Sequence, residues 1–244
     1  MKKTLTSAIL VAALCTLFTS CSKDETSSNS SGSSTSPGSA SNTQPSGCGT
    51  YYPIFNNSYT TLIKVGSPTS DSTRSTFIGK DTTINGKTYA VSRSTANNKT
   101  TTGYTRKDGT KVYIYSALSP KPFELLILDE SKTVGQTWEG GSFSNSSSAG
   151  GITSETINTY SLKVVKIHSS LTLGTGLTFN DVFEVNMTLT AETKVNGLTY
   201  NKTSYDAGNQ FYARCVGPIK TFTPQNPTFG FFNDQTQEVL RYKM

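Results

Sequence analysis

The stretch that decides the fold is Phe183-Glu184-Val185-Asn186-Met187-Thr188-Leu189-Thr190, along which apolar and polar residues alternate strictly. A period of two is typical of a β-strand that buries one face and exposes the other. The same segment continues into Thr193-Lys194-Val195-Asn196-Gly197-Leu198-Thr199-Tyr200, where Asn196-Gly197 suits the two central positions of a type I′ turn. The stretch therefore predicts an antiparallel hairpin with one buried face.

Two more turn signals lie closer to the N-terminus. Asn85-Gly86 separates Thr82-Thr83-Ile84 from Lys87-Thr88-Tyr89, and Asp108-Gly109 joins residues 104–107 to residues 111–115. Each pair suits a type I′ turn, because that turn needs φ > 0 at both central positions. They predict two further hairpins. The flanks of Asn85-Gly86 and Asn196-Gly197 do not match each other, which favours convergent turn chemistry over a duplicated sheet.

The remaining apolar segments also favour strands. Residues 123–128 form a short apolar run whose length indicates a central strand, and Pro120 and Pro122 prevent a regular helix just upstream. Tyr160, Leu162 and Val164 begin another alternating segment. No window of about 12 residues shows the 3.6-residue periodicity of a capped helix. We therefore predict an all-β fold built on an antiparallel sheet.

One glycine-rich segment interrupts these strands. Residues 140–151 read Gly-Gly-Ser-Phe-Ser-Asn-Ser-Ser-Ser-Ala-Gly-Gly. Small polar residues between glycines are typical of loops, and a loop of this length is often functional. The composition predicts a mobile loop that is either a lid or an insertion.

The first 20 residues have the order of a secretory signal peptide. Lys2 and Lys3 precede an apolar stretch, residues 8–18, that ends in Thr19-Ser20. Such a stretch is too short to cross a bilayer core, which needs about 20 apolar residues. We expect residues 1–20 to direct export and to be removed.

Cys21 follows this segment in a recognisable setting. Leu17-Phe18-Thr19-Ser20-Cys21 resembles the lipobox of bacterial lipoproteins, and Ser22-Lys23-Asp24-Glu25 resembles the export signal of Bacteroidota surface lipoproteins. The resemblance implies that Cys21 is lipidated and becomes the mature N-terminus. It also implies attachment to the outer membrane with exposure at the cell surface, where two or three acyl chains hold a protein firmly.

The next segment has the composition of a tether. From Thr26 to Gly47 the chain consists almost entirely of Ser, Thr, Asn, Gly, Pro and Ala, without charge or bulky apolar side chains. Such a segment cannot bury enough apolar surface to offset the cost of ordering. We divide the chain into the signal peptide 1–20, the lipidated cysteine with a disordered linker 21–47, and one β-rich domain 48–244.

Two cysteines remain for the domain, because Cys15 leaves with the signal peptide and Cys21 is the acylation site. Exported proteins permit disulfides, so Cys48 and Cys215 are a possible pair. The alternative is one buried and one exposed thiol.

Two segments of the domain resemble exported β-rich bacterial lipoproteins of uncharacterised activity. Val134-Gly135-Gln136-Thr137-Trp138 matches their Gly-x-x-Trp segment, and residues 211–220 match a later strand, with Cys215 in place of the usual Gly. The resemblance implies a sheet curled into a barrel or half-barrel, as in lipocalins or lipoprotein carriers. It implies no ligand.

The charge pattern limits the partners. Removal of Lys2 and Lys3 reduces the formal charge from +6 to +4, and the remaining basic residues are scattered without a run of five. A nucleic-acid partner is therefore not expected. The lipid anchor makes the membrane a partner, and we expect a monomer without a cofactor or metal.

The possible catalytic residues are few. His168 is the only histidine, and one histidine cannot build a His-rich zinc site. Asp129-Glu130 are adjacent carboxylates that would face opposite ways in a strand, so we expect a turn there. Gly174-Thr175-Gly176 lacks the third glycine of a dinucleotide fingerprint and is expected to be a turn.

Aromatic side chains are the remaining source of a binding surface. Tyr51-Tyr52, Tyr113 with Tyr115, and Phe229 with Phe231 and Phe232 could line a groove, although filling the core is the favoured interpretation. The sequence therefore favours a non-catalytic module that binds a glycan, a protein or an apolar ligand. The alternatives are a barrel that carries an apolar ligand and a hydrolase with dispersed carboxylates.

Overall fold

The structure is a computed structural model that describes residues 44–68, 71–117, 122–226 and 233–244. Residues 1–20, Cys21 and the linker as far as residue 43 lie outside the described residues. The expected aromatic cluster of Phe229, Phe231 and Phe232 lies outside them too.

Twelve antiparallel strands form one sheet, so the all-β prediction is confirmed. The strands are β1 (Tyr59–Lys64), β2 (Thr73–Ile84), β3 (Lys87–Ala96), β4 (Lys99–Asp108), β5 (Lys111–Ser116), β6 (Phe123–Asp129), β7 (Thr137–Ala149), β8 (Ile152–Thr172), β9 (Thr178–Val195), β10 (Leu198–Ala213), β11 (Gly217–Thr223) and β12 (Gln235–Lys243).

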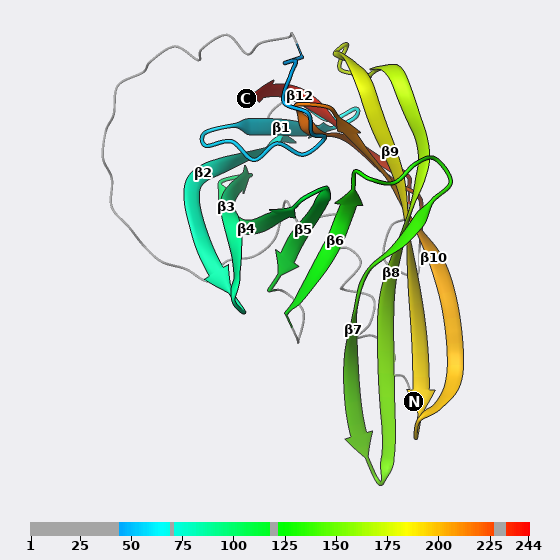
Figure 1. Cartoon of the computed structure of the whole chain (residues 1–244). Coiled ribbons are helices and arrows are strands. Elements are labelled where there is room, and N and C mark those ends of the chain that lie inside the picture. The colour runs from blue at the N-terminus through cyan, green and yellow to red at the C-terminus, as the bar shows by residue number, and fades with distance from the viewer. Residues whose placement is uncertain (1–43, 69–70, 118–121, 227–232) are drawn as a thin grey trace.

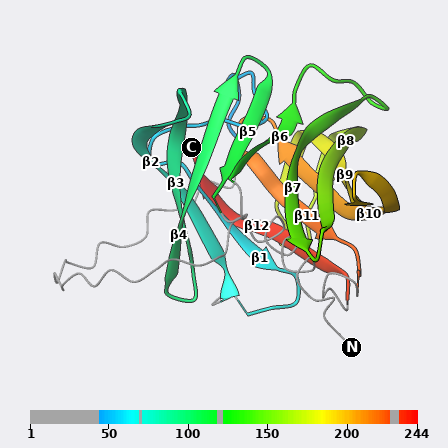
Figure 2. The ribbon, with the colours of Figure 1, turned by 90° about the horizontal axis from the view of Figure 1, so that it is seen from below.

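The sheet is nearly closed into a barrel. Its order is β6-β5-β4-β3-β2-β1-β12-β11-β10-β9-β8-β7, so β1 and β12 pair in the middle. Figure 2 shows this sheet curling around the interior, and Figure 1 shows the long strands β7 to β10 extending beyond the barrel at one end. The prediction of a curled sheet is thereby confirmed.

The two ends of the sheet, β6 and β7, meet without a strand ladder between the described residues. The Trp138 indole instead donates to the carbonyl oxygen of Leu126 at 3.3 Å. A Cβ on Gly141 would lie 2.8 Å from the carbonyl oxygen of Glu124, so the backbones approach closely. Residues 123–128 are thus a strand as predicted, but one at the end of the sheet. Their buried apolar side chains reflect burial inside the barrel and do not require two neighbouring strands.

The Asn-Gly turns take the predicted form. Asn85 and Gly86 have φ of 51° and 75°, and Asn196 and Gly197 have φ of 47° and 81°. Gly109 has a positive φ, but Asp108 does not, because β4 runs through Asp108. The third hairpin is therefore present, with its turn shifted by one residue.

The prediction of a mobile loop at residues 140–151 is wrong. This segment forms most of β7 and the turn at Gly150 and Gly151, and β7 pairs with β8 from Thr137↔Lys163 to Ala149↔Ile152. Serine and glycine have weak strand preferences of their own. The long partner strand β8 supplies the hydrogen bonds that their composition does not predict.

The core fills only part of the interior. Large apolar side chains from β6, β8 and β9 interlock in one cluster, including Leu125, Tyr160, Leu162, Phe183 and Met187. A second cluster gathers around Leu62, Phe179, Ile219, Val239 and Tyr242. Strands β2 to β4 contribute few such side chains, and the interior beside them is hollow.

Candidate binding site

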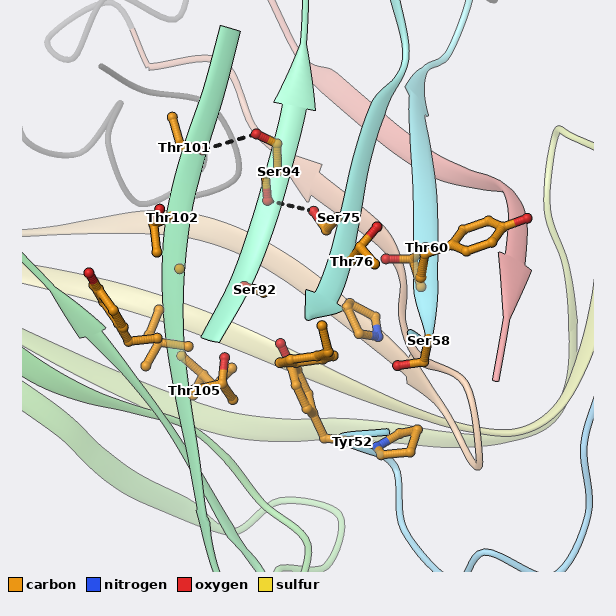
Figure 3. Close-up of a pocket in the computed structure, with 18 of the residues that line it drawn as sticks. Tyr52, Ser58, Thr60, Ser75, Thr76, Ser92, Ser94, Thr101, Thr102 and Thr105 are labelled. Atoms are coloured by element: carbon orange, nitrogen blue, oxygen red, sulfur yellow. Dashed lines mark hydrogen bonds between the residues drawn. The ribbon is translucent and has the colours of Figure 1, made fainter. Parts of the chain in front are cut away.

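The hollow has a volume of about 340 Å³ and lies between β1–β5 and residues of β10 and β11. Figure 3 shows hydroxyl side chains from β1 to β4 along one side of it, with Tyr52 opposite. This volume is near the lower end of the range of about 300–1,000 Å³ for small-molecule sites.

The hydroxyl side follows from the strand register. Thr60 pairs with Ser75, Ser75 with Ser94, and Ser94 with Thr101, so four hydroxyl side chains form one row across β1 to β4. Side chains in register on adjacent strands point to the same face of a sheet. The row therefore faces the hollow together.

A second row lies beside the first. The backbones of Ser58 and Phe77 are hydrogen-bonded, Phe77 pairs with Ser92, and Ser92 pairs with Gly103. A Cβ on Gly103 would lie 2.7 Å from the Ser92 hydroxyl, so the missing side chain leaves space that Ser92 leans into. The hollow exists because most of these inward positions, Phe77 excepted, carry small residues.

The opposite wall is aromatic and aliphatic. The rings of Tyr52 and Tyr212 lie 6.0 Å apart, and Ile114, Ile127 and Pro218 also line the hollow. Burial raises the pKa of Tyr52 to about 12, although a hydrogen bond with Thr105 opposes the shift. Burial also raises the pKa of Tyr212 well above its usual value. Both phenols are therefore neutral at physiological pH.

No Asp, Glu, Lys, Arg or His is among the described residues that line the hollow. The ligand environment consists of hydroxyls, aromatic rings, aliphatic groups, one Gln, the Met244 thioether and backbone. Such side chains can exchange hydrogen bonds and pack against apolar surface, and they offer no counter-charge to a buried ion.

The candidate catalytic residues lie elsewhere and do not converge. His168 Nε2 is 2.7 Å from Glu184 Oε2, and Asn209 donates to the other oxygen of this carboxylate. These residues stand on β8, β9 and β10, and none of them lines the hollow.

Asp129 and Glu130 accept hydrogen bonds from different residues. Asp129 ends β6 and accepts from the backbone and hydroxyl of Ser131. Glu130 lies in the turn and accepts from Thr50 and Lys107. The expected turn is confirmed. Gly174-Thr175-Gly176 likewise lies in the turn between β8 and β9.

The predicted aromatic pairs separate. Tyr51 packs on Phe183 and Tyr52 on Tyr212, inside the domain. Tyr113 lies under the guanidinium of Arg106, 4.0 Å from the ring centre, and Tyr115 packs against Tyr89. Of the four predicted tyrosines, Tyr52 and Tyr115 border the hollow, whereas Tyr51 and Tyr113 do not.

The start of the described chain is fastened to the domain. A disulfide joins Cys48 to Cys215, with their Cα atoms 5.4 Å apart. The Gln44 amide donates to the carbonyl oxygens of Asn180 and Arg214, so contacts with the domain begin four residues before Cys48. Arg214 also pairs with Asp181 and stacks on the Tyr51 ring.

Two features are absent from the described part of the chain. No group of three His, Cys, Asp or Glu residues is placed there to hold a metal ion. In the same part of the chain no helix has the length and apolar character needed to cross a membrane.

The sequence did not predict the hollow. Its signal was the recurrence of Ser and Thr at alternate positions, in Ser58-Tyr59-Thr60, Ser92-Arg93-Ser94 and Thr101-Thr102-Gly103. Alternation with small polar residues on both faces does not reveal which face is inward. The register supplies that information.

No protein-family model matches the chain, and no curated protein matches it. The crystal structure of a "putative lipoprotein" from Parabacteroides distasonis ATCC 8503 aligns with it at a TM-score of 0.43 and 9% identity, over 81% of this chain and 100% of that one. The likeness is one of strand arrangement, at a level that identifies no family.

Proposed function

We propose that this protein is a lipid-anchored, surface-exposed protein of the outer membrane whose domain binds a small uncharged ligand in the hollow, without catalysis. The observation that carries the proposal is a hollow of about 340 Å³ whose described lining contains no charged side chain. Burying an ion without a partner costs far more than burying a neutral hydrogen-bonding group. The hollow therefore favours a neutral ligand.

The two alternative functions fit the lining less well. A carrier of a fully apolar ligand needs walls of aliphatic and aromatic groups. One side of this hollow consists instead of rows of Ser and Thr side chains. A glycoside hydrolase that uses two carboxylates needs both of them beside the scissile bond. The described residues that line the hollow supply no carboxylate side chain, which supports a binding role.

The anchoring part of the proposal rests on the lipobox at Cys21 and the Lys23-Asp24-Glu25 signal. Mass spectrometry of the mature protein should find a diacylglycerol thioether on the N-terminal Cys21. Cys21→Ala should remove the protein from the membrane fraction, and replacing Lys23-Asp24-Glu25 by alanines should reduce its accessibility to protease on intact cells. An unmodified Cys21 in the processed protein contradicts the anchor.

The binding part can be tested with three probes of similar size that differ in charge. Saturation-transfer NMR on the mature protein in lipid nanodiscs would compare benzyl alcohol, benzoate and benzylammonium. We expect saturation of benzyl alcohol alone. Gly103→Val should abolish it, because the added side chain enters the hollow.

Two further variants keep this test interpretable. Ser92→Leu fills the same region if Gly103→Val fails to fold, and Thr88→Val adds an apolar group at an exposed position of β3 that is not part of the lining. Equal saturation of the charged probes, or binding that survives filling in a folded variant, contradicts the proposal.

A further inference from the structure

We infer that the ligand of the hollow is a neutral polyhydroxylated ring, that is, a sugar of one or two rings. This inference rests on the proposed function and deepens it by naming the ligand class. It follows from the hydrogen-bond balance of the hydroxyl rows on one wall and from the apolar character of the other.

The hydroxyl rows have more acceptors to offer than donors. A hydroxyl has one proton to donate and two lone pairs to accept. Ser58 donates to the Phe55 carbonyl oxygen at 2.7 Å, and Thr101 to the Ser94 carbonyl oxygen at 3.5 Å. Ser75 and Ser94 share one hydrogen bond of 2.7 Å.

Three of the six hydroxyl protons in the two rows are therefore donated within the protein. Only one lone pair of these hydroxyls accepts a hydrogen bond there. The hydroxyls of Thr60 and Ser92 have no hydrogen-bond partner among the described residues, so they can donate as well as accept. A matching ligand must bring several donors to this wall, together with acceptors for the three unused protons. Hydroxyl groups do so, while ether, ester or carbonyl groups bring acceptors only.

The opposite wall requires an apolar face on the same ligand. Tyr52 and Tyr212 are inclined to each other at 48°, and Ile114 extends the apolar surface. Removing the C–H surface of a ligand from water against such groups is favourable. A sugar ring combines an apolar C–H face with hydroxyls around its rim, so it satisfies both walls at once.

Two other ligand classes, alkyl chains and organic cations, each match only one wall. An alkyl chain packs on the aromatic wall but leaves the Ser and Thr hydroxyls without partners, which is costly in a desolvated site. An organic cation is attracted to tyrosine rings. Among the described residues that line the hollow, however, it finds no carboxylate side chain.

The inference can be tested by calorimetric titration of the mature protein in nanodiscs. The probes are the common neutral hexoses and their disaccharides, with glucuronate and glucosamine as charged counterparts, 1-octanol as the alkyl probe and choline as the cation. We expect a neutral sugar to bind and its charged counterpart to bind at least tenfold more weakly.

The hydroxyl rows give a matched pair of variants for this titration. Thr60→Val together with Ser92→Ala keeps the shape of the wall and removes two of its three free donors, and should weaken sugar binding by about tenfold. Thr88→Val makes the same chemical change on the exposed part of β3 and should leave the affinity unchanged. A loss of binding in both variants contradicts a direct role of the rows.

The outcomes separate this inference from the proposed function. If benzyl alcohol enters the hollow but none of the neutral sugars binds, the sugar inference is wrong and the proposed function stands. Tighter binding of 1-octanol or choline than of any sugar also overturns the inference. If neither benzyl alcohol nor any sugar binds, both proposals are wrong.

Discussion

Gly208 on β10 approaches β11 so closely that a Cβ on Gly208 would lie 1.9 Å from the carbonyl oxygen of Phe222. Its φ is 99°, and the register between β9 and β10 shifts between Asp206 and Gly208. Gly208→Ala therefore introduces a steric overlap and also forces an L-residue into a backbone conformation that L-residues rarely adopt. We expect it to lower the free energy of unfolding by about 3 kcal/mol or more, measured by denaturant titration.

Gly197 provides the matched control for this prediction. It also has a positive φ, 81°, but nothing lies within 4 Å of a Cβ built on it. Gly197→Ala should cost only the backbone strain, about 1 kcal/mol. Equal losses of unfolding free energy in the two variants would show that β10 does not approach β11 closely at Gly208.

The Cys48–Cys215 disulfide joins residues that are 167 positions apart. Cross-linking a long loop restricts the unfolded chain, so we expect Cys48→Ala/Cys215→Ala to lower the free energy of unfolding by about 2–5 kcal/mol. Thermal unfolding measures this loss. A reducing agent should reproduce it in the natural protein and leave the melting temperature of the double variant unchanged. A disulfide without effect on either measurement would contradict the prediction.

The residues that were predicted correctly are those whose local chemistry is enough to determine their secondary structure. Asn196-Gly197 needs only its own backbone preference to form the turn, and alternation from Phe183 to Leu189 needs only one buried face. Residues 140–151 depend instead on a distant partner: the strand β8 supplies the hydrogen bonds for a serine-rich β7.

The candidate site depended on long-range pairing in the same way. Thr60, Ser75, Ser94 and Thr101 are separated in the chain and become one row only through the register of four strands. Each of them alone looks like an ordinary polar strand residue. A hollow depends on the combined volume of all the inward side chains, so no single residue type predicts it.

Tyr242 and Tyr89 are both 2% exposed but differ in their hydroxyl contacts. The Tyr242 hydroxyl has no hydrogen-bond partner among the described residues, whereas Tyr89 donates to Glu124 at 2.6 Å. Tyr242→Phe should leave the free energy of unfolding unchanged or raise it by up to about 1 kcal/mol, and Tyr89→Phe should lower it by about 1.5–3 kcal/mol. Parallel denaturant titrations test the contrast, and a larger loss for Tyr242→Phe would refute it.

Glu124 should make stability depend on acid. Burial raises the pKa of its carboxyl, but hydrogen bonds from Lys87, Tyr89 and Arg106 outweigh burial and hold the pKa below its ordinary value of 4.5. The side chain is 18% exposed, so these contacts are only partly screened by solvent. A carboxyl whose pKa is lower in the folded state stabilises the fold above its unfolded pKa, and this contribution is lost as the pH falls through the folded value.

We therefore expect Glu124→Gln to lower the free energy of unfolding at pH 7 by about 1.5–3 kcal/mol, because three donors lose a charged acceptor. The difference from the natural protein should shrink as the pH falls below 4.5, where the carboxyl of the unfolded chain is protonated first. Asp108→Asn removes a 71% exposed partner of the same Arg106 and should change the free energy of unfolding by less than about 0.5 kcal/mol. Denaturant titrations of all three proteins between pH 7 and the acid transition would measure both effects. A constant difference between Glu124→Gln and the natural protein down to the acid transition would mean that Glu124 stabilises the fold through packing, and that its charge contributes nothing.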